Sequence, residues 1–432
     1  GRLQVGPGWT DRVRQDTRTE QKISQKRCDL IKLNGHGNSL NNGNNWLGLN
    51  WQLSLSSGWG IAGLNMARVM DLDGRFKAVP LLPSAQLEYS SEVFEPLVAK
   101  LQRREQEVAK VLGQAEEGRL ACDFSVIHSV GNEIHEEDMP YPGVPERVGS
   151  RNFAVVFFEL NSPSGYTTNN AKKFDIIFGG STWNSTVLKQ HGLGNVDTFL
   201  QGVDLELFQL RSKSQQERFV IFSGGKLEFR KGQDIVIAAF REFVKTHPDA
   251  VLATTWHNPW PKGMNGIVKA GRVEGVPQKN PDGDWGITEW ASNNGVPSEN
   301  FHDHGLVANH LMPEVFAQAD VALFPNRCEG GTNMVAMEAM ASGTPCIISA
   351  NTGHMDLIND DNCYPLLKQS EVTSFTNTKD WGESDVAEVL ENLERVYTDR
   401  QEARRHGEQA AKFMQDWSWE KRTGYLMDRI TQ

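Results

Sequence analysis

The sequence predicts an α/β protein built from two doubly wound domains of similar size. Two observations support this fold class: β-rich runs alternate with helical patterns in two series, and a polar linker at 209–218 separates the series. Strands that alternate with helices form a parallel sheet that is covered on both faces. A chain of 432 residues has room for two or three such domains, at about 100–200 residues each.

The first series follows a polar extension, 1–44, that contains an Asn/Gly-rich stretch. Beyond it, apolar residues at helical spacing predict helices, and short β-rich runs bounded by Gly, Asn and Pro predict strands. The expected strands span 46–55, 123–131, 152–160 and 174–181, and the expected helices span 61–72 and 95–112.

The second series repeats this pattern after the linker. A helix at 334–343 is expected to end at Gly343, because glycine readily adopts the left-handed conformation that often terminates helices. A segment rich in Trp, Pro, Gly and Asn, 257–300, is expected to form a long ordered loop. The other expected elements are strands at 218–225, 249–256, 320–326 and 344–349 and a helix at 233–248.

The composition excludes several classes of protein. Lys and Arg number 44 against 55 Asp and Glu, for a net charge of −11, so a general nucleic-acid binder is not expected. No apolar run approaches the ~18 residues of a transmembrane helix, and the first residues lack the apolar core of a signal peptide. The five cysteines are odd in number and form no CxxC motif, which predicts free thiols in a reducing, cytoplasmic setting.

A glycine-rich motif, GWGIAG at 58–63, lies between an expected strand and an expected helix. Three interpretations are open: a dinucleotide site, a tight turn without a ligand, or a phosphate or sugar contact made at a domain cleft. Dinucleotide folds place an acidic residue about 20 positions further on, whereas Asp71 and Asp73 come too early and Glu88 comes late. The contact at a cleft, made by the loop 57–60, is therefore favoured.

Two lysines five residues apart, Lys226 and Lys231, flank the turn GKLEFRKG that follows an expected strand. Ligands of open α/β sheets bind at this edge of the sheet, and paired cations there would neutralise the charge of a diphosphate. The turn is not a P-loop, because the pattern G-x-x-x-x-G-K-[ST] is absent. Taken by itself, a solvated basic turn would be the better interpretation.

Two carboxylates, Glu329 and Glu338, flank a Gly-rich loop and the start of an expected helix in CEGGTNMVAMEAMASGTP. Thr332 and Asn333 are expected to cap this helix near Met334, where free amides favour an anion. The carboxylates would repel phosphate but would accept hydrogen bonds from sugar and ribose hydroxyls. The alternative is a capped surface helix with incidental acidic residues, and the presence of the lysine pair makes it the weaker hypothesis.

Together, these segments resemble the retaining family 4 glycosyltransferases of GT-B architecture. The resemblance is carried by QGVDLELF, SGGKLEFRKGQDIVIAAF, the E-x7-E donor segment and WSWEKRTGYLMDRI, and it covers about 46–430. There are two departures from the family pattern. Lys226 replaces a more frequent Arg, and Glu329 and Glu338 lie nine positions apart instead of eight.

The resemblance implies two Rossmann-like domains that face each other across a cleft. They would comprise an acceptor-side domain at 45–208, a nucleotide-sugar-binding domain at 209–416, and a helix at 417–432 that crosses back to the first domain. It implies transfer of a sugar, with retention at the anomeric carbon, from a UDP-, GDP- or ADP-sugar to a hydroxyl of a glycan, a lipid-linked molecule or a small molecule. It also implies that no metal ion or other cofactor is needed, and it is compatible with peripheral membrane contact.

The resemblance further implies roles for single residues. Lys226 and Lys231 would stabilise the leaving diphosphate, and Glu329 would hold the donor-sugar hydroxyls. Glu159 occupies the strand end where many family members have a His, so it is a candidate for the reaction centre, with His128 as a rival. The expected donor-binding residues are Ser57, Gly58, Trp59, Gly60, Gly225, Gly330, Gly331, Thr332, Asn333, Met334 and Glu338.

Two weaker features and two rival functions stay open. The segment HEEDMP at 135–140 could hold a metal ion together with His128, although an acidic surface loop is the better interpretation. Tryptophans in 256–266, with Trp285 and Trp290, could stack on sugars or bases or could serve only in packing. The rival functions are an NAD-dependent oxidoreductase that uses GWGIAG and a non-catalytic paralogue that binds nucleotide sugars.

Overall fold

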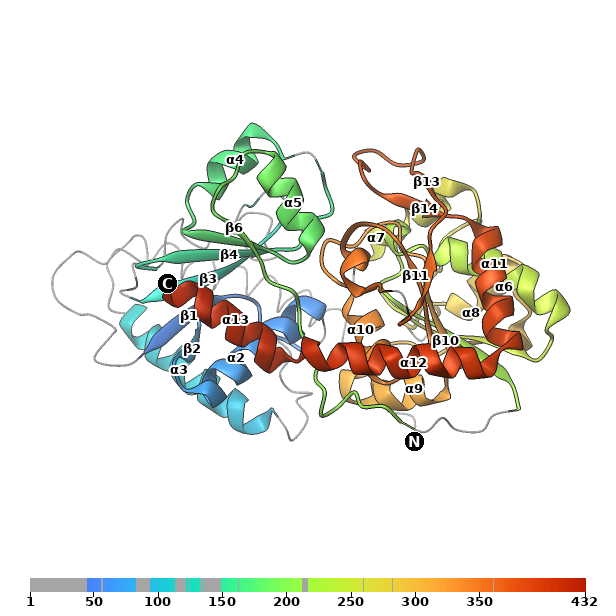
Figure 1. Cartoon of the computed structure of the whole chain (residues 1–432), viewed down its shortest axis with the longest axis horizontal. Helices are drawn as coiled ribbons and strands as arrows, with labels where there is room; N and C mark the ends of the chain where they lie inside the picture. The colour runs from blue at the N-terminus through green and yellow to red at the C-terminus, as the bar shows by residue number, and fades with distance from the viewer. Residues whose placement is uncertain are drawn as a thin grey trace. The chain divides into compact units, whose positions relative to one another are not determined.

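Two compact units make up the computed structural model, which describes residues 45–432 except 56, 83–93, 113–121, 123, 133, 135–148, 162, 212–216, 259, 282 and 360. The first unit runs to Phe158 and includes Pro163–Phe178 and Lys189–Asp197. The second unit comprises Glu159–Ser162, Gly179–Leu188 and Thr198–Gln432. Each unit is organised around one six-stranded sheet (Figure 1).

A parallel sheet forms the centre of the first unit. Its strands are β1 (Trp46–Asn50), β2 (Lys77–Pro80), β3 (Ser125–Val130), β4 (Asn152–Val156), β5 (Ile176–Gly179) and β6 (Val196–Thr198). The helices in this part of the chain are α2 (Gly58–Asp73), α3 (Glu95–Leu112), α4 (Gly165–Ala171) and α5 (Thr182–Gln190). The strand order is β2-β1-β3-β4-β5-β6, and β1 and β4 are buried along their whole length, as expected for a sheet covered on both faces.

The second unit contains a parallel sheet of the same size, with β7 and β10 as neighbours near its centre. The strand order is β12-β11-β10-β7-β8-β9. These strands are β7 (Phe219–Gly225), β8 (Ala250–Trp256), β9 (Phe301–Asp303), β10 (Val321–Phe324), β11 (Cys346–Ser349) and β12 (Tyr364–Leu366). A separate antiparallel hairpin is formed by β13 (Gln369–Glu371) and β14 (Gly382–Ser384).

Most of the helices belong to this second unit. The α-helices are α6 (Gln233–Thr246), α7 (Pro261–Met264), α8 (Ile287–Asn293), α9 (Met312–Gln318), α10 (Met334–Ala341), α11 (Val386–Thr398), α12 (Arg400–Met414) and α13 (Trp419–Thr431). Short 3-10 helices are η3 (Phe229–Lys231), η4 (Ile267–Ala270), η5 (Ser298–Asn300), η6 (Asn309–Leu311), η7 (Thr352–Leu357) and η8 (Gln415–Trp417).

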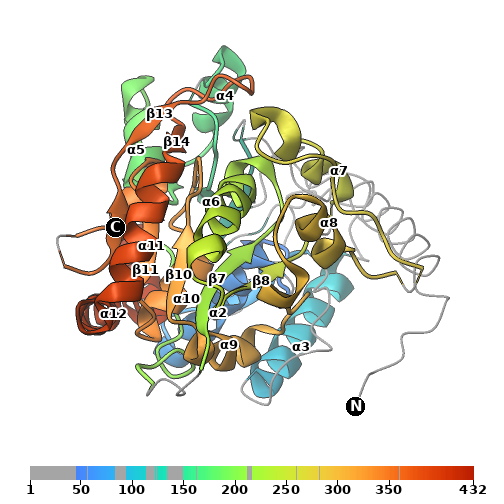
Figure 2. The same cartoon turned by 90° about the vertical axis from the view of Figure 1, so that its right-hand side faces the viewer.

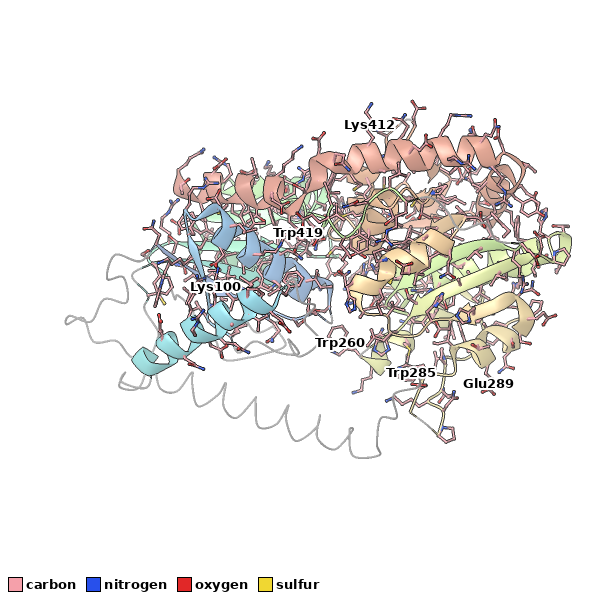
Figure 3. The ribbon with its side chains drawn as sticks, turned by 90° about the horizontal axis from the view of Figure 1, so that it is seen from below. Lys100, Trp260, Trp285, Glu289, Lys412 and Trp419 are labelled. Carbon is pink, nitrogen blue, oxygen red and sulfur yellow. The ribbon has the colours of Figure 1, made fainter. Side chains whose placement is uncertain are left out.

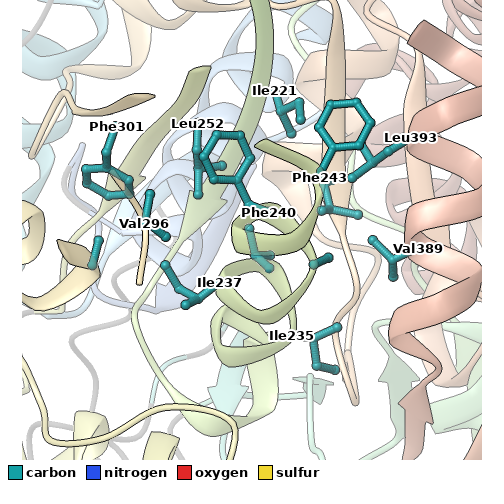
Figure 4. Packing of buried hydrophobic residues seen from close by; sticks show 14 of the residues in the cluster. Ile221, Ile235, Ile237, Phe240, Phe243, Leu252, Val296, Phe301, Val389 and Leu393 are labelled. Atoms are coloured by element: carbon teal, nitrogen blue, oxygen red, sulfur yellow. The ribbon is translucent and has the colours of Figure 1, made fainter. Parts of the chain in front are cut away.

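Alternate residues of the central strands face two different helix layers, as the pleat of a strand requires. On one face, Ile221 of β7 belongs to a cluster with α6 and α11; Figure 2 shows these elements and Figure 4 shows the packing of the side chains. On the other face, Phe222 belongs to a cluster with α9, α10 and α12. Fully burying one such side chain contributes about 1.5–3 kcal/mol, so these two layers hold the carboxyl edge of the sheet rigidly.

The predicted fold class is confirmed, with differences in the lengths of the elements. The helices expected at 61–72 and 233–248 are present as α2 and α6. The strand expected at 46–55 ends at Asn50, although Leu53 beyond it is fully buried. Apolar residues alone do not separate a strand from a buried loop, which explains this difference. The segment 257–300 is not a continuous loop, because it contains α7, η4 and α8.

Gly232, at the start of α6, lies so close to the backbone of Pro325 that a side chain there would not fit. Its φ is +72°, and a Cβ atom there would lie 2.3 Å from the carbonyl oxygen of Pro325. The left-handed conformation alone costs a larger residue about 1–2 kcal/mol. We therefore expect Gly232→Ala to lower the free energy of unfolding by at least about 3 kcal/mol, measured by urea denaturation.

Gly271 is a matched control for this substitution. Its φ is +68°, but nothing lies within 4 Å of the position that its Cβ would take. Gly271→Ala should therefore cost only the conformational part, about 1–2 kcal/mol. Equal losses in the two variants would show that the contact with Pro325 is unimportant.

Candidate active site

A cationic turn follows β7 at the carboxyl edge of the second sheet. Gly225, the last residue of β7, has a φ of +115°, and Gly232, which precedes α6, has a φ of +72°. Between these glycines the chain forms η3, which carries Arg230 and Lys231. Ligands of doubly wound proteins bind at this edge, so the turn lies where a ligand is expected.

Glu329 lies against this turn, in the loop that follows β10. Its Oε1 atom is 2.5 Å from Nζ of Lys231, and its Oε2 atom is 3.0 Å from Nη1 of Arg230. The side-chain amide of Asn326 also donates to Oε1. The side chain of Glu329 is only 7% exposed. Folding therefore brings together two predicted site residues, Lys231 and Glu329, that lie 98 positions apart.

The charge of Glu329 is maintained by its neighbours. Burial by itself would raise the pKa of Glu329, but the charges of Lys231 and Arg230 outweigh burial and lower this pKa to about 2. Glu329 is therefore an ion near neutral pH. An ionised carboxylate can only accept hydrogen bonds, which suits it to hydroxyl groups.

Arg230 is a central residue of this site that the sequence analysis missed. Its guanidinium contacts three carboxylates: Glu329, Glu228 at 2.6 Å and Glu159 at 3.5 Å. Burial opposes its charge, but these three carboxylates raise its pKa well above the ordinary value. Its position directly before Lys231 was a signal that could have identified it.

Glu159, the candidate for the reaction centre, lies beside this cluster. It belongs to the second unit, and burial raises the pKa of its carboxyl despite the nearby charge of Arg230. Its backbone oxygen accepts a hydrogen bond from the indole N–H of Trp381 at 2.8 Å. The position of Glu159 is compatible with the expected role, and the role itself stays a prediction.

Lys226, the second predicted phosphate ligand, lies on the same turn but contacts an aromatic ring. Its ammonium group is 5.0 Å from the ring centre of Trp260, which is 56% exposed and is labelled in Figure 3. The loop that carries Trp260 is tied to the turn, because the amide of Asn258 donates to the backbone oxygen of Leu227 at 2.9 Å. Such a cation–π contact contributes only about 0.5–1 kcal/mol at an exposed site, so a diphosphate could recruit this lysine.

The loop between Glu329 and α10 differs from the prediction in its capping. Asn333 occupies the N-cap position with a φ of +62°, but its side chain makes no capping hydrogen bond. It is hydrogen-bonded instead to Nε2 of His354, 2.9 Å away, and the hydroxyl of Thr332 donates to the sulfur of Met337. The predicted side-chain cap is therefore wrong. The first N–H groups of a helix without such a cap are well suited to an anion.

Glu338, within α10, has surroundings opposite to those of Glu329. The amide of Asn309 donates to its Oε1 atom at 2.7 Å. Burial raises the pKa of Glu338 to about 8, because no cation acts on it strongly enough to compensate. Glu338 is therefore mainly protonated near neutral pH, and it can both donate and accept hydrogen bonds.

Arg327, which the sequence analysis also missed, links the turn to α6 and β14 through buried ion pairs and hydrogen bonds. Its side chain is completely buried, and both Nη atoms donate to Asp234 of α6 at 2.7 Å. Its Nε donates to Glu383 of β14 at 2.5 Å, and Arg272 also pairs with Glu383. The Nη1 atom additionally donates to the backbone oxygen of Phe229 at 2.6 Å, the first residue of η3. Arg327 therefore positions the turn that carries the cations.

In the first unit, the loop at the start of α2 has a structural explanation. The hydroxyl of Ser57 caps α2 by accepting the N–H of Gly60 at 3.1 Å. A Cβ atom at Gly60 would lie 2.0 Å from the hydroxyl of Ser54, so glycine is required there for packing. The ring of Trp59 packs edge-on against Phe157. These contacts agree with a tight turn, and donor contacts by Ser57, Gly58, Trp59 and Gly60 stay a prediction.

His128 lies in β3 with both ring nitrogens hydrogen-bonded. Nδ1 is 2.9 Å from the amide nitrogen of Asn50, and Nε2 is 3.0 Å from the side-chain oxygen of Asn152. The residue is 1% exposed, and burial lowers the pKa of its imidazole to about 4. This geometry describes a neutral histidine of the sheet core, so its catalytic role is only a prediction.

Among the described residues, no cluster of three or more His, Cys, Asp or Glu side chains could hold a metal ion. The acidic segment 135–140 lies outside the described residues. No helix in the described part of the chain is long and apolar enough to cross a membrane. The four described cysteines, Cys122, Cys328, Cys346 and Cys363, form no disulfide and are buried.

Two doubly wound units, one of which carries a cationic turn against a carboxylate, define a protein of the GT-B class. Comparison with known families agrees with this class. Residues 191–426, more than half of the chain, match the family described as Family 4 Glycosyltransferase in conflict systems, and the chain belongs to this family of glycosyltransferases.

Individual relatives are distant. The chain is 26% identical over 167 residues to the GDP-mannose-dependent alpha-(1-6)-phosphatidylinositol monomannoside mannosyltransferase of Mycolicibacterium smegmatis, a match that spans 37% of each protein. Two solved structures share its fold. The sucrose-phosphate synthase of Thermosynechococcus elongatus has a TM-score of 0.57 at 14% identity. Anabaena HepE in complex with UDP and glucose has a TM-score of 0.56 at 14% identity. Both matches cover 90% of this chain and 99% of the other.

The raised pKa of Glu338 predicts how stability depends on pH. Between its ordinary value of 4.5 and about 8, Glu338 is ionised in the unfolded chain but protonated in the folded protein. The folded form then binds the extra proton, so this residue makes the free energy of unfolding fall as the pH rises through that window. Glu338→Gln removes the effect, and its thermal stability should increase relative to wild type from pH 5 to pH 8.

The exposed Glu289 of α8 provides the control for this measurement. Glu289→Gln should give a stability curve parallel to that of the wild type across the same pH range. A Glu338→Gln curve that also runs parallel would mean that Glu338 is ionised in the folded protein at neutral pH.

Proposed function

We propose that the protein is a retaining hexosyltransferase that moves a sugar from a nucleotide-sugar donor to a hydroxyl acceptor. The observation that carries this proposal is the buried cluster at the carboxyl edge of the second sheet, where Lys231 and Arg230 share the carboxylate of Glu329. Membership of a glycosyltransferase family and the GT-B class support it.

The chemical problem is the departure of a nucleoside diphosphate from an oxocarbenium-like carbon. Negative charge grows on the leaving oxygen, so fixed cations and amide N–H groups stabilise the transition state. Lys226 and Lys231 supply the cations, and the amides at 331–333 supply the donors at the start of α10. Since these groups carry the charge, we infer that the transfer needs no divalent metal ion.

The carboxylates divide the remaining tasks. Glu329, held as an ion by Lys231 and Arg230, accepts hydrogen bonds from the donor-sugar hydroxyls. Glu338, with a pKa of about 8, can exchange hydrogen bonds with both ribose hydroxyls. We assign Glu159 to the reaction centre, and its carboxylate 3.5 Å from Arg230 supports this assignment. Retention at the anomeric carbon is inferred from the family that the sequence resembles.

The donor is tested directly with nucleotide sugars. Two nucleotides are associated with the similar proteins: UDP is bound in the HepE structure, and GDP-mannose appears in the name of the mycobacterial enzyme. The purified protein is incubated with UDP-glucose, GDP-mannose or ADP-glucose, and release of the nucleoside diphosphate is followed. Slow hydrolysis of one donor is expected. Nucleotide binding without any release, with or without acceptors, would indicate a non-catalytic paralogue.

The two lysines provide the sharpest test of the phosphate site. Lys226→Ala and Lys231→Ala each remove one charge-assisted hydrogen bond, worth roughly 1.5–3 kcal/mol. We expect turnover to fall about 10- to 150-fold in each variant, measured as nucleoside diphosphate release. Thermal stability should change little in Lys226→Ala, whereas Lys231→Ala also breaks the buried ion pair with Glu329 and should be less stable. Lys245→Ala, which removes an exposed ion pair with Glu242 on α6, is the control and should retain full turnover. Wild-type turnover in both variants would remove the phosphate assignment.

Glu329→Gln separates the sugar contact from the phosphate contact. The amide keeps the size of the side chain but leaves Lys231 and Arg230 without their shared charge. We expect turnover to fall at least about tenfold, while affinity for UDP or GDP alone equals or exceeds that of the wild type, measured by calorimetry. A parallel loss of affinity for the sugar-free nucleotide would count against this division of roles.

A further inference from the structure

An unusual hairpin closes one side of a large cleft in the second unit. Residues 367–385 connect β12 to α11 and contain β13 and β14, whereas such connections usually take only a few residues. A cleft of about 970 Å³ is lined by this hairpin, by the loop between its strands and by Asn351, which follows β11. The cleft therefore lies at the carboxyl edge of the sheet, the side that carries the candidate active site.

The loop of the hairpin is held in one conformation by its neighbours. Two residues other than glycine have a positive φ: Asn377 at +60° and Asp380 at +71°. The carboxylate of Asp380 accepts hydrogen bonds from the amide of Asn161 and the indole of Trp183. Thr378 donates to a backbone oxygen within the loop at 2.8 Å. Strained residues persist only where the surroundings determine them, and they are enriched at binding sites.

Two aromatic rings line this cleft in parallel. The rings of Trp381 and Phe375 are 6.3 Å apart with an interplanar angle of 17°, and Phe375 stacks in turn on Phe229 of η3. Both rings that line the cleft are half-buried. The indole N–H of Trp381 donates to the backbone of Glu159, which fixes the plane of this ring. Phe375 is covered by Phe229 and by the ammonium of Lys269, 3.8 Å from its ring centre, so Trp381 is the aromatic platform of the cleft, and its orientation is fixed in advance.

The remaining lining groups are mostly polar. They include the amides of Asn351, Gln369 and Asn377, the carboxylate of Asp380 and the ammonium of Lys379. A sugar ring offers the matching surfaces: C–H groups that pack on the negative face of an aromatic ring, and hydroxyls that bond to amides and carboxylates. Binding sites generally combine such an apolar wall with a few positioned polar groups.

We propose that this cleft of the second unit binds the saccharide part of the acceptor, with a sugar ring against Trp381, so that the acceptor site extends beyond the 45–208 domain that the family resemblance implies. The assignment as acceptor site, rather than as a saccharide site alone, rests on the proposed function. Two contacts join the cleft to Glu159 and Glu329, the carboxylates beside Arg230. Trp381 bonds to Glu159, and the hydroxyl of Thr352 accepts the N–H of Glu329 at 2.8 Å while donating to Asn351 at 3.0 Å. A saccharide in the cleft would lie next to these reacting groups.

The test measures saccharide binding in the absence of nucleotide, so it is independent of the transfer reaction. The full chain is titrated with maltotriose, cellotriose, mannotriose and chitotriose, followed by saturation-transfer NMR. At least one of these is expected to bind with millimolar affinity, about −4 kcal/mol. Trp381→Ala should weaken that binding about tenfold, the loss expected for one aromatic platform. Trp381→Phe, which keeps the platform but loses the indole N–H, should weaken it less than about threefold.

Two controls separate this site from its alternatives. Tyr425→Ala alters an exposed aromatic residue of α13, outside the cleft, and should leave saccharide binding unchanged. UDP and GDP binding reports on the lysine turn and should be the same in Trp381→Ala and wild type. If Trp381→Ala weakened nucleotide binding about tenfold instead, the cleft would hold the nucleoside. That result would overturn the proposal, as would a failure of all four saccharides to bind at about 20 mM.

Discussion

The buried guanidinium of Arg327 is the constraint on which the rest of the site depends. A charge without access to water is costly unless it is paired and fully hydrogen-bonded. Asp234 of α6 and Glu383 of β14 meet this requirement. The guanidinium of Arg327 therefore links the start of α6, the turn after β7 and the hairpin to one another. Apolar packing could stabilise such a junction equally well. We infer that the ion network contributes geometry, because only directional bonds orient the turn that carries the cations.

The active site balances its charges internally. Arg230 contacts three carboxylates, and Lys231 shares one of them, so these two cations of the turn are already paired with carboxylates. In the proposed mechanism, a diphosphate would compete with Glu329 for Lys231, so donor binding would exchange ion pairs rather than fill a vacant cationic pocket.

Glu159 connects the two parts of the site. Its carboxylate lies beside Arg230, and its backbone oxygen holds Trp381 of the proposed saccharide cleft. A movement of the hairpin would thus reach Arg230 through Glu159, in addition to the contact of Thr352 with Asn351 and Glu329. Glu329 and Glu338 belong to the same segment but differ in protonation. Glu329 is an ion and Glu338 is mainly a neutral acid near neutral pH, because only Glu329 lies against cations.

The sequence by itself determined the fold class, the two series of elements, the cationic turn and the carboxylate segment. Periodicity and glycine spacing are local properties, and they can be read without knowing which segments meet. Only the tertiary structure decided that Lys231 pairs with Glu329, that Asn333 bonds to His354 instead of capping α10, and that Arg327 lies buried beneath the turn. It also decided the protonation of Glu338, because burial and the distance to a cation depend on residues that are far apart in the chain.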